Sequence, residues 1–314
     1  MVDVIVPVHN GEKYLKQCMD SILEQDFADL QVICVNDAST DRSLAILRDY
    51  AAKDGRVVVV DKKQNGGVSA ARNSALDVST GEYVCFVDCD DRVEPNFVST
   101  MLEAFDDQTA VVSCVMVRQH RNLRRFRNKN VTRTEYSVSQ AKVEVFRDET
   151  LTMRLCNKMF RGDLARSKRF DEDMFFGEDC VYVCHCLEAC SSQKVVHVSA
   201  KLYHYNVTPG SLSGMHCSLD NFRKLHLWTE EMERLREDAS GELADEFRLA
   251  VDSWLFLIHL QFFLFARSLR LKEDKKKMRA YGKSKLAAYK KFRKNHVVFY
   301  NRLGHWLFAI EKIL

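Results

Sequence analysis

The sequence predicts an α/β protein with a mainly parallel sheet, followed by an all-helical extension. Residues 1–115 alternate short apolar runs, typical of buried strands, with amphipathic stretches typical of helices. Because strands separated by helices of about 10–15 residues need crossover connections, we expect the strands to pair in parallel. From about Leu219 onward the pattern is helical throughout. We therefore expect one domain over residues 1–215 and a helical region over residues 216–314.

The elements of the first domain follow one another in a regular order. Apolar runs predict strands at residues 2–8, 30–37, 56–61, 83–88 and 110–115. Amphipathic stretches predict helices at residues 11–25, 39–53 and 68–78, the second with Ser39 or Thr40 as its N-cap. The segment 118–150 loses this pattern and becomes basic and polar. We expect it to form an excursion beside the functional site.

Composition indicates a soluble globular protein. Of the 314 residues, 46% are hydrophobic and 29% are charged, which is enough to build a large core. The opening MVDVIVPVHN has an acid, Asp3, and a strand pattern where a secretory signal would have basic residues and a longer apolar core, so we expect no signal peptide. The 11 cysteines are odd in number and scattered, which favours reduced thiols and a cytoplasmic location over a disulfide framework.

Four cysteines lie close together in one predicted helix. They are Cys180, Cys184, Cys186 and Cys190. The spacing C-x3-C-x-C-x3-C lacks the C-x2-C pairs that are typical of zinc sites. We therefore favour small buried side chains over a metal or iron-sulfur site.

Four polar clusters come directly after predicted strands or close behind them. They cover residues 7–10, 35–41, 65–73 and 87–91. Ligands bind at the carboxyl ends of the strands in a doubly wound sheet, so we expect these clusters to converge on one cleft. Asp88 and Asp90 point the same way in an extended backbone, and their like charges repel unless a divalent cation neutralises them. The alternative is that residues 88–91 only cap a helix that begins near Pro95.

In this order the four clusters resemble those of the family 2 inverting glycosyltransferases, and the resemblance covers roughly residues 2–215. It implies the GT-A fold, a Rossmann-like arrangement of a mainly parallel sheet with flanking helices. It also implies that Asp37 reads the uracil of a UDP-sugar and that Pro7, His9 and Asn10 flank the same base. The family commonly has Tyr where this chain has His9.

The same resemblance implies the residues that handle the diphosphate. Arg72 follows the glycine pair 66–67 and would direct a fixed cation toward the phosphates. Asp88 and Asp90 resemble the D-x-D motif of the family, so Asp88 would contribute to both the donor site and the metal site. Carboxylates of this kind hold Mn²⁺ or Mg²⁺, whose remaining ligands include substrate phosphates.

The pair Glu178–Asp179 resembles the E-D pair of the family, whose aspartate is the catalytic base. An inverting transfer needs one carboxylate to take the proton of the acceptor hydroxyl as that oxygen attacks the anomeric carbon. Asp179 is the predicted base, and Glu178 is the next candidate. The alternative is that the pair only caps a helix, because acids are favourable at a helix N-terminus.

Residues 201–214 lie close to the place where some relatives supply a histidine to the metal. His204 is the candidate for that ligand, and Ser211 and Ser213 would reach phosphate oxygens of the donor. A histidine in an alternating strand is more often only packed or exposed, so that alternative stays open for His204.

We therefore predict a metal-dependent inverting glycosyltransferase that moves a sugar from a nucleotide-sugar, in the simplest case a UDP-sugar. The acceptor would be a carbohydrate or lipid-linked glycan in cell-surface polysaccharide synthesis. One alternative, a sugar nucleotidyltransferase, would carry a glycine-rich triphosphate loop after the first strand, whereas PVHNGEKYL has one glycine. A second alternative, a nucleotide- or nucleic-acid-binding module, would not need both Asp90 and Asp179, so we expect no nucleic-acid partner.

The C-terminal region is strongly basic. Between Phe265 and Leu303 it has 14 Lys or Arg against two acids, Glu273 and Asp274. The apolar run at residues 254–266 is shorter than the roughly 20 residues that a membrane-spanning helix needs. The basic helices would suit an anionic membrane surface, in this case the inner face of the cytoplasmic membrane. Packing within the protein or in a homodimer is an equal alternative.

Overall fold

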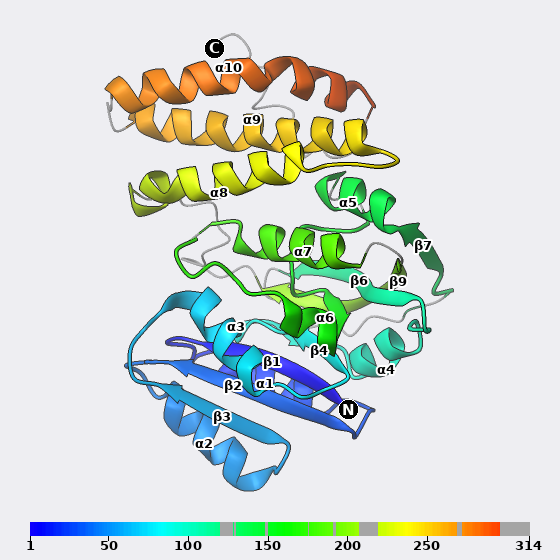
Figure 1. Ribbon diagram of the computed structural model, residues 1–314. Coiled ribbons are helices and arrows are strands. Elements are labelled where there is room, and N and C mark those ends of the chain that lie inside the picture. The colour runs from blue at the N-terminus through cyan, green and yellow to red at the C-terminus, as the bar shows by residue number, and fades with distance from the viewer. Residues whose placement is uncertain are drawn as a thin grey trace. The chain divides into compact units, whose positions relative to one another are not determined.

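The apolar runs of the N-terminal half form strands of one mixed sheet in the computed structural model (Figure 1). The structure describes residues 1–119, 128, 130–147, 150–174, 176–190, 193–206, 219–268 and 272–295. The strands are β1 (Val2–Val8), β2 (Leu30–Asp37), β3 (Val57–Lys62), β4 (Tyr83–Phe86), β5 (Arg92–Val93), β6 (Thr109–Gln119), β7 (Arg133–Ser137), β8 (Lys158–Arg161) and β9 (Lys194–Asn206). Their order is β3-β2-β1-β4-β8-β6-β9-β5, and β7 also pairs with β9.

The first half of the sheet is parallel, as predicted, and the second half is mixed. Strands β3, β2, β1 and β4 pair in parallel, whereas β8 lies antiparallel between β4 and β6. Strand β8 has the sequence KMFR and begins with Lys158, which is only 1% exposed. The ammonium of Lys158 donates to the carbonyl of Arg154 and to Asn157 Oδ1. With only Met159 and Phe160 as apolar residues, β8 leaves no apolar run, which is why the sequence pattern does not predict it.

The chain divides into two compact units. The first comprises Met1–Val138 and Arg154–Gly214, and the second comprises Ser139–Met153 and Met215–Leu314. The helices of the first unit are α1 (Leu15–Leu23), α2 (Ser43–Lys53), α3 (Gly67–Val78), α4 (Phe97–Leu102), α6 (Gly162–Ser167) and α7 (Glu178–Ala189). Helix α3 packs on β1 and β2, and α6 packs on β4 and β8. The four clustered cysteines, three in α7 and Cys190 directly after it, are buried thiols.

Helices α1 and α2 begin later than their amphipathic patterns predict. The hydroxyl of Ser39 accepts a hydrogen bond from the backbone N–H of Asn10, so it does not cap α2. Arg42 is the N-cap residue, and the carboxylate of Asp41 before it accepts from the N–H of Ser43 at 2.9 Å. The polar residues before each helix therefore connect the loops at the carboxyl ends of β1 and β2.

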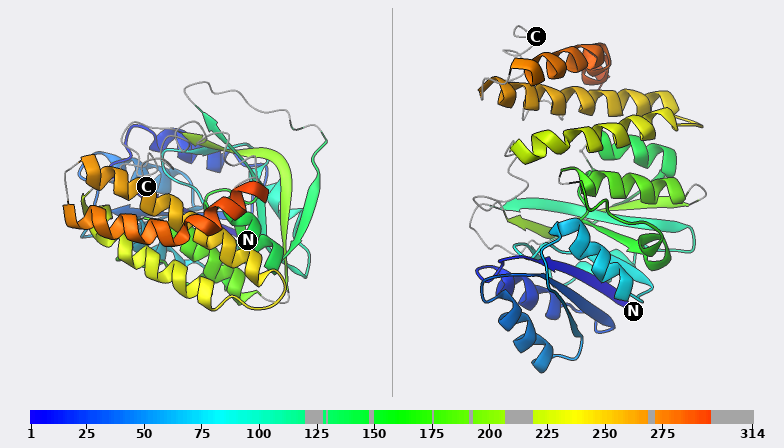
Figure 2. Two further views of the ribbon diagram at one scale, coloured as in Figure 1. Left: turned by 90° about the horizontal axis from the view of Figure 1, so that it is seen from above. Right: turned by 60° about the vertical axis from the view of Figure 1, so that its left-hand side comes forward.

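The second unit consists of helices α5 (Val138–Arg147, which begins at the last residue of the first unit), α8 (Leu219–Glu237), α9 (Ala244–Ser268) and α10 (Lys272–Asn295). Helix α9 packs against both α8 and α10 (Figures 1 and 2). Within the apolar run at 254–266, Leu255, Phe256, Phe262 and Phe263 are at most 3% exposed, so this run forms the core of the unit. No helix of the described chain is long and apolar enough to cross a membrane.

Candidate active site

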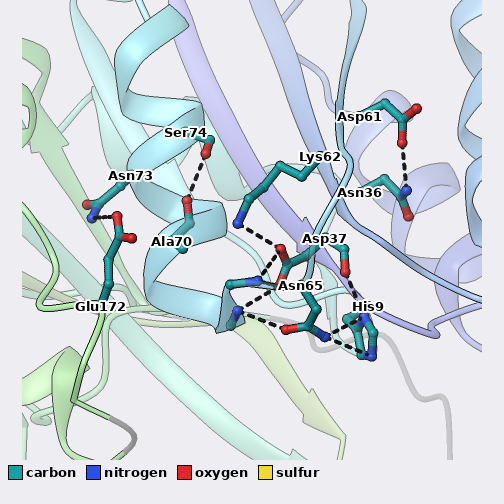
Figure 3. Close-up of polar contacts among 12 residues, drawn as sticks. His9, Asn36, Asp37, Asp61, Lys62, Asn65, Ala70, Asn73, Ser74 and Glu172 are labelled. Carbon is teal, nitrogen blue, oxygen red and sulfur yellow. Dashed lines mark hydrogen bonds and ion pairs between the residues drawn. The ribbon is translucent and has the colours of Figure 1, made fainter.

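Asp37, at the end of β2, binds the loop that leads into α3 (Figure 3). Its carboxylate accepts hydrogen bonds from the N–H groups of Gly66 and Gly67 at 3.0 and 2.8 Å, and it pairs with the ammonium of Lys62 at 2.7 Å. Gly67 has a φ of +85°, a conformation that a residue with a Cβ rarely adopts, so glycine is required at this turn. The side chain of Asp37 is only 3% exposed. To accept a hydrogen bond from a nucleotide base, the carboxylate would have to give up one of these contacts with the loop or with Lys62.

His9 and two asparagines connect the loops that follow β1, β2 and β3. Nδ1 of His9 lies 2.8 Å from the carbonyl oxygen of Asp37, and the side-chain amide of Asn65 contacts the ring nitrogens of His9 at 3.1 Å (Figure 3). The side-chain amide of Asn10 lies 3.1 Å from Nε2 of the same ring. His9 and Asn10 are exposed, so both are accessible to a planar base. Pro7, in contrast, is buried within β1. The predicted contact of Pro7 with the donor is therefore not supported, because its ring presents almost no surface.

Arg72 of α3 lies at the centre of a cluster of carboxylates. Its guanidinium contacts Asp179 at 2.6 Å, Asp88 at 3.1 Å and Glu178 at 3.3 Å, and its side chain is 4% exposed. Burial alone would lower the pKa of Arg72, but the negative charges of these three carboxylates raise it above its ordinary value. The sequence predicts an arginine directed at a diphosphate. In this structure the guanidinium of Arg72 contacts both Asp88, the predicted metal ligand, and Asp179, the predicted base.

Arg72 packs on the ring of Phe170, and Asn73 fixes the backbone of Phe170. The guanidinium lies over the ring of Phe170, 5.3 Å from its centroid, which is a favourable cation–π distance. Asn73, one residue after Arg72, exchanges two 2.9 Å hydrogen bonds with the backbone of Phe170. Neighbouring residues of α3 therefore supply the guanidinium of Arg72 and hold the ring of Phe170 against it.

The two acids that begin α7 differ in their surroundings. The helix starts at Glu178, directly after Gly177, whose φ is +74°. Asp179 is 26% exposed, and its second carboxylate oxygen lies 3.4 Å from the N–H of Leu155. Glu178 is 16% exposed, and its pKa is raised to about 7, mainly by burial and further by the charge of Asp179. Asp179 is thus the better oriented and more accessible of the two.

The carboxylates that follow β4 form a site that suits a divalent cation. Asp88 and Asp91 offer ligand atoms within 4.8 Å of each other and of the Cys156 thiol. The pKa of Asp88 is raised to about 6 by burial and by the charges of Asp179 and Asp90, against the opposing effect of Arg72. A cation would relieve this concentration of negative charge.

Asp90 and Asp91 differ in their surroundings. Both oxygens of Asp91 accept hydrogen bonds, from Tyr203 and from the N–H of Asn206, and the residue is 2% exposed. Burial raises the pKa of Cys156 well above its ordinary value, and Mg²⁺ and Mn²⁺ favour oxygen over sulfur. Asp90 is half-buried, and its backbone carbonyl accepts from Asn206. Asp91 therefore anchors the turn, and Asp90 stays the predicted second ligand beside Asp88.

His204 does not belong to this set. The residue is 2% exposed on β9, with Nε2 bonded to Glu94 and Nδ1 3.2 Å from the guanidinium of Arg92. Its two ring nitrogens are thus engaged in the pairing of β5 with β9, so the predicted metal ligand is better described as a packed histidine. Ser211 and Ser213, the predicted phosphate contacts, lie outside the described residues.

Sequence reasoning missed several residues of the site. Lys62 ends β3 just before a polar cluster, a position that could have drawn notice. The sequence pattern places Asp91 in the polar cluster at residues 87–91 but gives it no role of its own. Phe170 and Cys156 carry no pattern that distinguishes them from core residues.

The comparisons with known proteins identify the family. Residues 3–166, just over half of the chain, match the model of glycosyl transferase family 2. The chain belongs to this family. It is 30% identical over 257 residues to glycosyltransferase GlyA of Streptococcus pneumoniae, an alignment that covers 77% of this chain and 34% of GlyA. It is 34% identical over 220 residues to the minor teichoic acid biosynthesis protein GgaB of Bacillus subtilis, covering 69% of this chain and 24% of GgaB.

A solved structure confirms the fold. The crystal structure of S. aureus TarS residues 1–349 in complex with UDP-GlcNAc superposes with a TM-score of 0.62 at 20% identity, covering 94% of this chain and 92% of that one. The predicted GT-A fold with C-terminal helices is therefore confirmed. The chain spans only about a third or less of the full length of GlyA and GgaB.

The Asp37 network gives a prediction for stability. Replacing Asp37 by Ala should destabilise the protein by about 2–4 kcal/mol, because it leaves the nearly buried Lys62 ammonium and two loop N–H groups without their acceptor. Urea unfolding of the variant measures this loss. Asp49→Ala is the control, since its ion pair with Lys53 is exposed and should contribute less than about 1 kcal/mol. Equal effects of the two substitutions would show that Asp37 is not an anchor.

Proposed function

We propose that the chain transfers a sugar from a UDP-sugar to a hydroxyl of a carbohydrate or lipid-linked glycan, with inversion at the anomeric carbon. One observation carries this proposal: Arg72 contacts both Asp88, a carboxylate suited to the donor's cation, and Asp179, a carboxylate suited to the acceptor's proton. A substrate whose diphosphate lies at Asp88 would have its anomeric carbon near Asp179. Family membership supports the same reaction class.

The proton transfer is assigned to Asp179. As the acceptor oxygen bonds to the anomeric carbon, the bond from that carbon to the diphosphate breaks, and the hydroxyl proton passes to the carboxylate of Asp179. The contacts with Arg72 and Leu155 hold the carboxylate in one orientation, which favours attack from a single direction. Glu178 is the neighbouring carboxyl group and the second candidate, because it is less exposed than Asp179 (16% against 26%).

The diphosphate is assigned to the carboxylates after β4. Asp88 and Asp90 would hold Mn²⁺ or Mg²⁺, which neutralises the charge of the leaving nucleotide. Arg72 lies one hydrogen bond from Asp88 and is positioned to interact with the same phosphates when the site is filled. The exposed ring of His9 and the amides of Asn10 and Asn65 supply flat and polar surface for the base.

The donor and the pathway rest on relatives. TarS is described in complex with UDP-GlcNAc, which supports a UDP-linked sugar here. GgaB is described as a minor teichoic acid biosynthesis protein, which supports an acceptor in cell-surface polysaccharide synthesis. An acceptor carried on a lipid would confine the reaction to the inner face of the cytoplasmic membrane.

A panel of nucleotide-sugars tests this function. UDP-sugars should raise the unfolding temperature by several degrees in the presence of Mn²⁺ and by much less in EDTA, because a ligand that binds only the folded state stabilises it. GDP-, ADP- and dTDP-sugars serve as matched ligands with other bases. Equal stabilisation by every base would remove the uracil assignment, and no stabilisation by any nucleotide-sugar would contradict the proposed function.

A further inference from the structure

Helix α10 has one face that packs and one face that is exposed. On the packed face, the ammonium of Lys285 lies 2.7 Å from Asp252 and 2.8 Å from Glu233. The hydroxyl of Tyr281 donates to Glu233, and the ring of Tyr289 lies 4.4 Å from that of Phe256. These contacts with α8 and α9 fix the rotation of α10 about its own axis.

The opposite face of α10 is a row of lysines. The exposed lysines of this helix, which we call the lysine face, are Lys276, Lys277, Lys283, Lys290 and Lys291. Spacings of seven residues return to the same side of a helix, so the row extends about 22 Å along one face. Between these lysines the exposed residues are Ala280, Ser284 and Ala287. Among the described side chains, this face has no large apolar residue and no aromatic ring.

The charge of this segment is not balanced by acids along the chain. From Lys275 to Ile310 the sequence has no Asp or Glu, although it has 11 Lys or Arg. Of these, Lys285 is used in the internal ion pairs, whereas the five residues of the lysine face point away from α8 and α9. The internal ion pairs described for α10 therefore involve Lys285 and not the lysine face.

We propose that the lysine face docks the protein onto an anionic lipid surface without inserting into it. A planar layer of lipid phosphates can approach all five ammonium groups at once, and each is attracted by the negative surface potential. The tyrosines that would otherwise enter the headgroup region are engaged on the packed face. Binding of the lysine face to the lipid surface should therefore be electrostatic and reversible. An amphipathic helix, in contrast, buries apolar side chains in the membrane.

Other occupants fit the lysine face less well. Proteins that bind single-stranded nucleic acid usually combine basic charge with aromatic rings on which bases stack, and no described side chain of this face supplies one. A second copy bound through the same face would bring like charges together, which opposes a homodimer at this surface. A homodimer through other surfaces of the C-terminal helices stays a prediction.

Sedimentation with lipid vesicles tests the proposal. The full chain should remain in the supernatant with phosphatidylcholine vesicles and pellet increasingly as phosphatidylglycerol rises, and binding should weaken as salt is added. Replacing the five lysines together by Gln, a good helix former, should weaken binding at least tenfold, since each lysine near the surface contributes roughly fivefold. Circular dichroism and the unfolding temperature should match those of the parent protein, because these side chains are exposed.

A matched variant separates the lysine face from net charge. Gln at five exposed lysines of the first unit, Lys13, Lys16, Lys53, Lys63 and Lys201, removes the same charge and should leave vesicle binding nearly unchanged. Equal losses in the two variants would overturn the proposal in favour of net charge alone. Failure of the parent protein to bind anionic vesicles at low salt would also overturn it. So would tighter binding of an oligonucleotide than of vesicles at equal phosphate concentration.

Discussion

Replacing Asp179 by Asn should lower turnover by roughly 10²-fold or more while donor binding stays nearly intact. Asparagine keeps the size of the side chain, and its oxygen can still accept the hydrogen bond from Arg72 that Asp179 accepts at 2.6 Å. It cannot take a proton, so the loss should fall on the chemical step. Single-turnover kinetics measure that step, and calorimetric titration with the donor measures binding.

Glu178→Gln is the matched control for this experiment. Glu178 contacts the same guanidinium at 3.3 Å, so both substitutions remove one charge next to Arg72. The control should retain most of the turnover if only Asp179 accepts the proton. A variant of Asp179 that lost donor affinity but kept its turnover would make Asp179 a binding residue, and the base would then have to be sought at Glu178.

Replacing Asp90 by Ala, or adding EDTA to the parent protein, should nearly abolish transfer. The departing diphosphate carries concentrated negative charge. Without the metal ion, Arg72 would have to stabilise more of that charge, although it already pairs with three carboxylates. Activity should return to the EDTA-treated protein on adding excess Mn²⁺ or Mg²⁺. Full activity in EDTA would contradict the metal assignment.

Asp91→Asn distinguishes the loss of a ligand from the loss of the turn. Both oxygens of Asp91 accept hydrogen bonds from neighbours within the first unit, so this substitution should reduce stability more than it reduces metal affinity. Asp90→Ala should show the reverse pattern. Metal titrations and urea unfolding of the two variants together therefore identify which carboxylate holds the cation.

The sequence predicts the parallel half of the sheet well because burial on both faces leaves continuous apolar runs. All seven residues of β1 are buried, including Asp3, whose carboxylate accepts from Ser79, Thr80 and Gly81. The same logic fails at β8, a strand of four residues that begins with a buried lysine and has only two apolar side chains. A local sequence pattern predicts which residues are buried. It does not predict the distant hydrogen-bond partners that stabilise a buried charge.

The site residues show the same limit. Sequence patterns place Asp88 after a strand, Arg72 within a helix and Asp179 at a helix start, and the structure brings the three together. Spacing does not reveal that the guanidinium faces carboxylates, because those partners are 16 and 107 residues away along the chain. It also cannot distinguish a metal-binding histidine from His204, which is paired with Glu94 at a distance of 110 residues.

The central claim is a direct displacement in which Asp179 accepts the proton, and proton NMR of slow donor hydrolysis tests it most directly. Without an acceptor, water takes the place of the attacking hydroxyl, so the acceptor need not be known. The sugar released first, recorded before mutarotation, should have the anomeric configuration opposite to that of the UDP-sugar, and Asp179→Asn should suppress its release. A first-formed sugar that retains the donor's configuration would contradict direct displacement.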